Sequence, residues 1–357
     1  MPDRDLVLNI YKILGLAGAA FFVGIMLTPL LTHYLYKYKL WKKNSVAKTI
    51  TGELALISQK LHNDEAKKTP RMGGILVWGT TLLVALFFWL LQMLFPDPIF
   101  SKLNFLSRNQ TWVPLGILLA GALVGLVDDV LVVTNKGTYN GGGLTATRRI
   151  LLVAVIAIMG AYWFYFKLGV NTVFIPGFGE VTVGLLFIPI FIIVMLAVFS
   201  GGVIDGLDGL SGGVLASIFA SYSGIAFFQN QVDIAAFCAV ITGAILAFLW
   251  FNIPPARFYM SETGIMGLMT TLTVVAFLTD AVAVLPIIAF PLVIESASVI
   301  IQLLSKKFLK RKVFLVAPIH HHFEALGWPS SKVVMRFWII GFVFSILGLI
   351  IHLISRI

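Results

Sequence analysis

Long apolar runs recur along this 357-residue chain, and they constrain its fold more than any other feature. A helix that crosses a bilayer needs about 20 mostly apolar residues. The chain is therefore predicted to be an all-α, polytopic integral membrane protein. We expect about ten transmembrane helices, at residues 10–35, 74–95, 113–133, 149–168, 183–203, 210–228, 233–251, 264–280, 282–304 and 335–354.

The composition excludes the other broad classes of protein. Hydrophobic residues make up 59% of the chain and charged residues 12%, whereas soluble proteins carry about 25% charge. The one cysteine, Cys238, cannot form a disulfide within the chain. We attribute the net charge of +10 to cytoplasmic loops and to contact with anionic membrane lipids, with no nucleic acid as partner.

The distribution of Lys and Arg predicts the orientation. Cytoplasmic loops of membrane proteins carry an excess of both residues. Most of the 26 lie on the side that holds the two larger loops, 37–72 and 305–334, which we expect to be cytoplasmic. Both termini then lie outside, and residues 1–357 form a single transmembrane domain. Six cations lie on the other side: Arg4, Lys12, Lys102, Arg108, Lys167 and Arg356.

The start of the chain does not resemble a signal peptide. Asp3, Arg4 and Asp5 precede the first apolar run, where a signal peptide carries a cationic segment, and no small-residue cleavage site follows. We therefore interpret the first run as a retained helix of a multi-pass membrane protein.

Side chains capable of chemistry converge on the predicted cytoplasmic face. Asp128 and Asp129 are adjacent at the inner end of one helix, and Val130–Val133 continue the apolar run beyond them. Carboxylates at membrane depth cost about 2.5–3.5 kcal/mol each on insertion scales, so this pair needs a cation, a metal or a polar cavity. A solvated helix end is the alternative.

Two further acidic motifs lie in inner connections. In Asp205-Gly206-Leu207-Asp208, the carboxylates share a face if the segment is helical, and glycine lets a ligand approach the backbone. This pattern suits a metal or a sugar nucleotide; an ordinary loop with Asp as a helix N-cap is the alternative. Glu262 opens a later helix and could equally be a favourable first-turn acid.

The same face carries aromatic, amide, histidine and lysine side chains. Asn252 and Tyr259 could bind a base, or belong to an interfacial aromatic belt. The run His320-His321-His322 could bind phosphate, whereas its spacing disfavours a three-histidine zinc site. Lys67 precedes a helix start where cations could hold phosphate oxygens, or could serve only as flanking charge. Glu295 lies inside a helix and should face protein or a cavity.

These motifs resemble a known family over nearly the whole chain. The similarity is to the polyprenyl-phosphate N-acetylhexosamine-1-phosphate transferases, and the histidine triplet after Ala317-Pro318 is most similar to the branch that transfers phospho-MurNAc-pentapeptide. The residues that carry the resemblance are Thr69-Pro70, Met72-Gly73-Gly74, Asp128-Asp129, Asp205–Leu210, Trp250-Phe251-Asn252, Glu295-Ser296 and Ala317–Glu324.

The resemblance implies a reaction and a cofactor. Phospho-MurNAc-pentapeptide would pass from UDP-MurNAc-pentapeptide to undecaprenyl phosphate, giving lipid I and UMP for peptidoglycan biosynthesis. The enzyme would use Mg²⁺ and lie in the bacterial inner (cytoplasmic) membrane. Its active site would open to the cytoplasm, and a homodimer is one candidate for its oligomeric state.

The resemblance also implies residue roles. Asp128 is the favoured base, and Glu262 stands where the family carries a magnesium-binding Asp. The implied catalytic residues are Asp128, Asp129, Asp208 and His321; the implied magnesium ligands are Glu262, Asp128 and Asp129. The implied substrate-binding residues are Lys67, Asp205, Asn252, Tyr259, His320 and His322.

Several positions depart from the family pattern. Glu262 replaces an Asp, and its longer side chain fits strict octahedral geometry poorly. Val132 stands in place of a Lys and Arg71 in place of a Thr, while Phe199 and Gly202 stand in place of Asn. Arg71 and Arg149 are candidates for the missing positive charge. We expect a divergent but active enzyme.

Three alternatives remain open. The first is a transferase that uses another UDP-N-acetylhexosamine, such as UDP-GlcNAc, and the second is a degenerate member without catalysis. The third is a secondary transporter, which the one-sided carboxylates and the lack of an inverted repeat disfavour. The sequence also leaves open whether the lipid phosphate attacks directly or through a covalent enzyme intermediate.

Overall fold

The computed structural model describes residues 4–42, 68–107, 111–137 and 142–357, and almost all of its regular structure is helical. Within this part of the chain, nine helical segments are long and apolar enough to cross a membrane. They contain α1 (Arg4–Lys37), α3 (Ile75–Leu94), α5 (Trp112–Thr134), α6 (Ala146–Tyr162), α7 (Phe187–Ser200), α8 (Leu210–Phe228), α9 (Val232–Asn252), α10 (Ser261–Leu278) and α14 (Ser330–Ile354).

Shorter elements connect these helices. A π-helical turn, Trp163–Lys167, extends α6, and 3-10 turns flank α7 at Gly184–Leu186 and Gly201–Ile204. The remaining helices are α4 (Pro98–Leu103), α11 (Leu285–Ile288), α12 (Phe290–Leu304) and α13 (Ile319–Ala325), with a 3-10 turn at Val282–Val284 and a π-helical turn at Ser305–Leu309. The polytopic all-α prediction is therefore confirmed.

The segment predicted as one straight helix over 282–304 is broken instead. Val282–Ile288 and Phe290–Leu309 are bent by 80° at a short break. Pro291 lies in the first turn of α12, and because proline has no N–H and clashes with the preceding turn, it favours a kink or a break at this point. Counted as one span, this bent pair raises the number of candidate crossings in the described residues from nine to ten.

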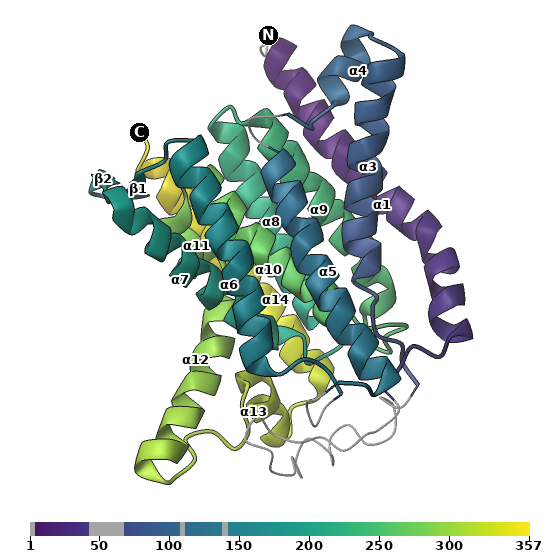
Figure 1. The fold of residues 1–357 in the computed structure, drawn as a ribbon, viewed down its shortest axis with the longest axis vertical. Coiled ribbons are helices and arrows are strands. Elements are labelled where there is room, and N and C mark those ends of the chain that lie inside the picture. Colours follow the sequence, from purple (N-terminus) through teal and green to yellow (C-terminus); the bar gives the residue numbers. More distant parts are fainter. Residues whose placement is uncertain (1–3, 43–67, 108–110, 138–141) are drawn as a thin grey trace.

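The bend sends α12 away from the bundle, as Figure 1 shows. The first turn of α1 and the C-terminus both lie towards the upper end of the molecule in that view, whereas α13 lies at the lower end. An even number of passes through the bundle accounts for this arrangement. The sidedness relative to a membrane stays a prediction.

One short hairpin at the upper end departs from the all-α expectation. β1 (Thr172–Ile175) pairs antiparallel with β2 (Gly179–Thr182), with Thr172 opposite Thr182 and Ile175 opposite Gly179. The connecting turn contains Pro176 followed by Gly177, which adopts a positive φ of 82°. Proline fixes φ and glycine tolerates positive φ, so this pair forms a tight turn between two extended segments.

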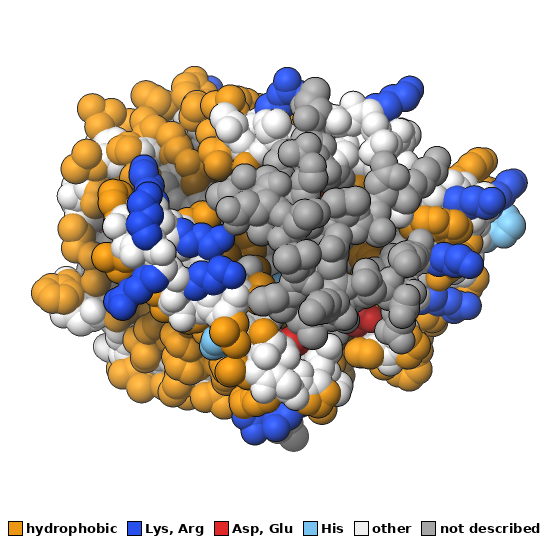
Figure 2. All heavy atoms as spheres, turned by 90° about the horizontal axis from the view of Figure 1, so that it is seen from below, with side chains coloured by type: hydrophobic (Ala, Val, Ile, Leu, Met, Phe, Trp, Pro, Cys, Tyr) orange, Lys and Arg blue, Asp and Glu red, His pale blue; other side chains and the backbone are white. Residues whose placement is uncertain are grey.

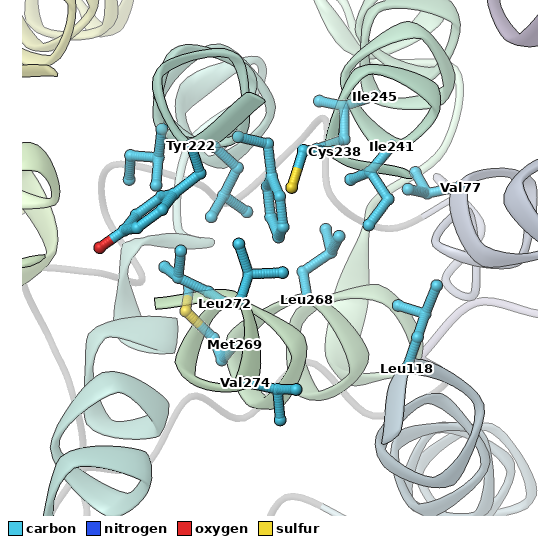
Figure 3. Packing of buried hydrophobic residues seen from close by; sticks show 14 of the residues in the cluster. Val77, Leu118, Tyr222, Cys238, Ile241, Ile245, Leu268, Met269, Leu272 and Val274 are labelled. Atoms are coloured by element: carbon cyan, nitrogen blue, oxygen red, sulfur yellow. The ribbon is translucent and has the colours of Figure 1, made fainter. Parts of the chain in front are cut away.

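The centre of the bundle is formed by α8, α9 and α10, which are the most buried of the candidate spans in the described residues. The most buried span is α10, with 89% of its most apolar window buried inside the protein. Figure 3 shows Tyr222 of α8, Cys238 and Ile241 of α9, and Leu268 and Leu272 of α10 meeting in one cluster. Cys238 is a buried free thiol. This packing fixes the position of α10, whose first turn begins at Ser261.

The lower end carries the predicted functional residues. Figure 2 shows this face with hydrophobic side chains around its outline and groups of Lys and Arg upon it. Acidic side chains are visible there only as small patches. Asp128, Asp129 and Glu295 are buried, so these carboxylates need partners within the protein.

Candidate active site

Asp128 and Asp129 lie at the lower end of α5, and the side chains of both are fully buried. Their position follows from the close packing of α5 on α10. A Cβ at Gly125 would overlap the backbone carbonyl of Glu262, and one at Gly121 would approach Met266 O to 2.8 Å. Because these glycines allow the two backbones to meet, the aspartate pair lies beside the first turn of α10.

Asp129 joins three segments of the chain. Its Oδ1 accepts a hydrogen bond from Arg71 Nε at 2.9 Å, and its Oδ2 accepts one from the backbone N–H of Thr263 at 2.9 Å. The second bond satisfies an N–H in the first turn of α10, which has no acceptor within the helix. Asp129 is therefore a buried anchor with both carboxylate oxygens engaged.

Arg71 reaches this position because residues 70–74 pair with the residues before α10. Tyr259 N donates to Pro70 O at 2.9 Å, and Gly73 N donates to Tyr259 O at 2.8 Å. Met72 and Ser261 have positive φ values of 67° and 58°. Non-glycine residues adopt this conformation at a cost, and such strain is typical of functional sites.

Asp128 faces the opposite side, towards α6. Its Oδ1 accepts a hydrogen bond from Leu144 N at 2.6 Å, and its Oδ2 lies 3.0 Å from Nη2 of Arg149. Nη1 of the same guanidinium donates to Glu262 Oε1. Arg149 therefore bridges the carboxylates of Asp128 and Glu262. Oδ2 of Asp128 accepts no hydrogen bond from the described residues, although it is buried.

Asp205 is the second carboxylate bound to the start of α10. Its Oδ2 accepts a hydrogen bond from Ser261 N at 2.9 Å, and its Oδ1 accepts one from Ser211 Oγ at 2.7 Å. Burial raises the pKa of Asp205 above its usual value, and the two hydrogen bonds act in the opposite direction. The Asp205 carboxylate thus caps the N-terminus of α10. It does not cap α8, the helix that follows Asp205 in the sequence.

Asn252, Asp208 and Tyr259 surround the same loops. Asn252 is buried, its Oδ1 accepts from Gly209 N at 2.9 Å, and its Nδ2 donates to Phe258 O at 2.8 Å. Asp208 accepts from Ala256 N at 3.0 Å. These bonds tie the loop at 205–209 to the segment between α9 and α10. Asn252 therefore joins these two segments through both ends of its amide.

The three histidines lie on α13, and each ring has a different partner. His320 and Glu295 are fully buried and joined through Nδ1 and Oε2 at 2.9 Å. His321 Nδ1 lies 2.7 Å from an oxygen of Glu324. His322 Nδ1 accepts from the backbone N–H of Leu315 at 3.2 Å. The expectation that Glu295 faces protein is confirmed, and the three rings do not converge on one point.

The histidine helix packs directly against the acidic loop. A Cβ at Gly206 would collide with His320 Nε2 and lie 3.3 Å from His321 Nε2. Residue 206 therefore has to be glycine for α13 to reach this position. Through this contact the motif at 205–208 and the histidine run, more than a hundred residues apart in sequence, lie side by side at the lower end.

The structure brings together most of the predicted site residues. Asp128, Asp129 and Glu262 form one group with two arginines, and the acidic loop and histidines form the adjoining wall. Lys67 lies outside the described residues. Sequence reasoning noted Arg71 and Arg149 only as sources of charge and did not place them between the carboxylates. The replacement of the family's Thr by Arg71 was the feature of the sequence that could have indicated this arrangement.

The predicted magnesium ligands do not form a metal site in this structure. Among the described residues, no three His, Cys, Asp or Glu side chains come together in a group that could hold a metal ion. Both oxygens of Asp129 and one oxygen each of Asp128 and Glu262 are bound by N–H groups. The three predicted ligands are thus arranged around guanidinium groups, and they do not fit a magnesium ion in this arrangement.

Comparison with known proteins identifies the family. Residues 111–280 match the model of glycosyl transferase family 4. A phospho-N-acetylmuramoyl-pentapeptide-transferase from Anoxybacillus flavithermus is 33% identical over 349 residues, covering 97% of this chain and 99% of the relative. The chain belongs to the phospho-N-acetylmuramoyl-pentapeptide-transferase family. Members from Rubrobacter xylanophilus (36% over 293 residues; 80% and 83% covered) and Bacillus thuringiensis (32% over 345 residues; 94% and 96% covered) are also similar.

Membership of the phospho-N-acetylmuramoyl-pentapeptide-transferase family confirms the resemblance drawn from the motifs. The chain is a transferase with multiple membrane-spanning helices. The matched segment contains Asp128, Asp205 and Glu262, whereas Arg71 and the histidine run lie outside it. Glycosyl transferases commonly use a divalent metal ion. In this chain two arginines lie among the acidic residues, where their positive charge offsets the negative charge of the carboxylates.

Proposed function

We propose that the chain transfers phospho-MurNAc-pentapeptide from UDP-MurNAc-pentapeptide to undecaprenyl phosphate, leaving lipid I and releasing UMP. In this reaction an oxygen of the lipid phosphate attacks the phosphorus that carries the sugar. The bond from that phosphorus to the bridging oxygen breaks, and UMP leaves with the electron pair. The names of the relatives and their coverage of the whole chain support this assignment. The protein would act in the bacterial cytoplasmic membrane, with the site facing the cytoplasm.

The observation that carries the catalytic assignment is the state of Asp128. Its side chain is buried, and its Oδ2 accepts no hydrogen bond from the described residues while lying 3.0 Å from Arg149. An acceptor left in this state is available for a proton. We assign Asp128 as the base that takes the proton from the attacking lipid phosphate. Asp129, with both oxygens engaged, holds the site in place.

The second wall would receive the nucleotide sugar. Asp205 and Asp208 hold their loop against α10, and the helix α13 brings His321 next to Gly206. Charged and aromatic groups at this junction suit a uridine and a sugar diphosphate. We therefore propose that Asp205 and Tyr259 contact the uridine, and that Asp208 and His321 line the sugar and diphosphate.

Magnesium dependence stays a prediction. The resemblance named Asp128, Asp129 and Glu262 as ligands, but Mg²⁺ needs six oxygens in near-ideal octahedral geometry. Arg71 and Arg149 occupy the space between these carboxylates. We therefore derive no step of the reaction through a metal ion.

The test is UMP release by the purified full-length protein in detergent. UDP-MurNAc-pentapeptide and undecaprenyl phosphate are supplied together, and a parallel reaction contains UDP-GlcNAc. Both reactions are run with magnesium and with excess EDTA. UMP release that needs the lipid and the MurNAc substrate supports the proposal. Release only with UDP-GlcNAc moves the chain to the other branch, and no release from folded protein supports the degenerate alternative.

A further inference from the structure

Two guanidinium groups lie among three carboxylates at the lower end of α5, and we call these five residues the arginine–carboxylate cluster. Arg149 contacts Asp128 and Glu262, and Arg71 contacts Asp129. The aspartate side chains are fully buried, whereas the side chains of Arg71 and Arg149 are 26% and 24% exposed. The arginine side chains are therefore the more exposed members of the aspartate–arginine pairs.

The cations offset the negative charge of the carboxylates. Without them, three carboxylates would repel the two negative charges of a nucleoside diphosphate. Arg71 pairs with Asp129, and Arg149 pairs with Asp128 and Glu262. With two guanidinium groups among three carboxylates, one net negative charge remains instead of three. An incoming diphosphate therefore meets a largely neutralised cluster.

The hydrogen bonds of the cluster leave little room for a divalent cation. Arg71 and Thr263 N hold the two oxygens of Asp129, and Leu144 N holds Oδ1 of Asp128. A magnesium ion binds oxygen at about 2.0–2.1 Å and keeps several waters. To bind here it would have to displace at least one guanidinium and approach the other, against the repulsion of like charges.

Donors remain for an anionic ligand. Arg71 contacts Asp129 through Nε, and no hydrogen bond joins either of its Nη groups to the described residues. Nε of Arg149 is buried without a hydrogen-bond partner in the same part of the chain. A guanidinium carries five N–H donors in a planar fork that matches phosphate oxygens, commonly in pairs. Arg71 can therefore hold Asp129 and a phosphate together.

We propose that Arg71 and Arg149 take over the charge-neutralising part of a divalent cation, so that this chain binds its nucleoside diphosphate sugar without a metal ion. The inference deepens the proposed function and rests on it for the class of substrate. It assigns to the two arginines a binding role towards the diphosphate. It also accounts for an arginine that follows Thr69-Pro70 and for a second one directed at Glu262.

The first test measures binding of UDP to the purified full-length protein by titration calorimetry. Titrations are carried out in excess EDTA and in excess Mg²⁺. We expect the two affinities to agree within about twofold, because the guanidinium groups are part of the chain. An affinity that falls about tenfold or more on metal removal, the equivalent of about 1.4 kcal/mol, overturns the inference. The inference is also overturned if UDP binds neither in excess EDTA nor in excess Mg²⁺.

The second test exchanges the arginine for a metal site. Arg149→Ala frees Asp128 and Glu262, so UDP affinity in EDTA should fall about tenfold to a hundredfold, the range for a lost charged hydrogen bond. Added Mg²⁺ should restore part of it. Arg148→Ala, at the exposed neighbouring arginine on α6, is the matched control and should bind UDP as the unmodified protein does. An Arg149→Ala affinity equal to that of the control overturns the inference.

Metal binding can also be measured directly on the unmodified protein, so this test does not depend on the stability of a variant. The electron paramagnetic resonance signal of Mn²⁺ without nucleotide reports whether the ion is bound, and the unmodified protein should leave it free in solution. Stoichiometric Mn²⁺ binding by the unmodified protein that Asp129→Asn abolishes would contradict the proposal. These measurements need neither the sugar nor the lipid. Failure of UMP release alongside metal-free UDP binding would therefore reject the proposed function and leave this inference standing.

Discussion

Arg71 donates from Nε to Oδ1 of Asp129 over 2.9 Å, and this contact joins the segment before α3 to the lower end of α5. The aspartate is fully buried, and its other oxygen accepts from Thr263 N in α10. One carboxylate therefore fixes three segments that are far apart in the sequence. The contact gives Asp129 a structural part that its neighbour Asp128 does not share.

Replacing Asp129 should reduce stability. Asp129→Asn removes the negative charge and leaves Arg71 without its anionic partner. Breaking a fully buried ion pair costs about 3–5 kcal/mol. Because Arg71 is 26% exposed, water offsets part of this loss, and we expect about 2 kcal/mol. Thermal unfolding in detergent, followed by tryptophan fluorescence, measures the change.

Asp5→Asn is the matched control for that substitution. Asp5 lies 3.0 Å from Lys102, but its side chain is 80% exposed. Pairs in this setting contribute little to stability. A melting temperature for Asp129→Asn that equals the value for the control would show that the buried contact does not hold the segments together.

Asp128 should matter for the rate more than for stability. In Asp128→Asn the amide oxygen can still accept from Leu144 N, but the side chain no longer takes a proton. General-base catalysis contributes about a hundredfold to ten-thousandfold, so UMP release should fall by that factor. Asp97→Asn is the control, because Asp97 caps α4 at the upper end and asparagine caps a helix equally well. Undiminished release by Asp128→Asn would exclude this residue as base and as nucleophile.

The contact between Gly206 and the histidine helix predicts a steric effect. Gly206→Ala would drive a methyl group into His320 Nε2, and overpacking of this kind costs about 1–3 kcal/mol. We expect weaker UDP binding and lower UMP release, since α13 has to move away from the acidic loop. Gly116→Ala, in α5 with no atom near its added Cβ, should change neither. Normal UDP affinity in Gly206→Ala would separate the histidines from the nucleotide site.

Much of the fold could be predicted because hydrophobic length is a local property of the sequence. Nine of the ten expected spans correspond to long helices, and the tenth is broken where Pro291 interrupts it. The hairpin at 172–182 lies in a short connection, and its strands are too brief for periodicity to reveal. Packing contacts such as Gly125 on Glu262 depend on pairs of helices distant in sequence, so no local pattern could show them.

The sequence predicted which residues belong to the candidate site, but it did not predict which of them contact one another. Asp128 was singled out because a carboxylate at membrane depth is costly, whereas Asp205 and His320 were singled out by the motifs in which they lie. The sequence does not tell which cation reaches which carboxylate. Arg149 bridges two acids from different helices, and Asp205 caps a helix that starts more than fifty residues later. Both relationships arise only when the helices pack.

The burial of Asp205 makes a prediction about pH. Its pKa lies above the usual value of about 4 because burial disfavours the charged form. The folded protein therefore holds this proton more tightly than the unfolded chain does. The stabilisation from that proton is present below pH 4 and is lost as the pH rises through the raised pKa. Asp205→Asn removes this titration. The melting temperature of the variant, relative to the unmodified protein, should therefore rise between pH 4 and pH 7.

The comparison within one pair of proteins cancels the titration of every other group. A flat or falling difference for Asp205→Asn would show that the hydrogen bonds from Ser211 and Ser261 outweigh the cost of burial.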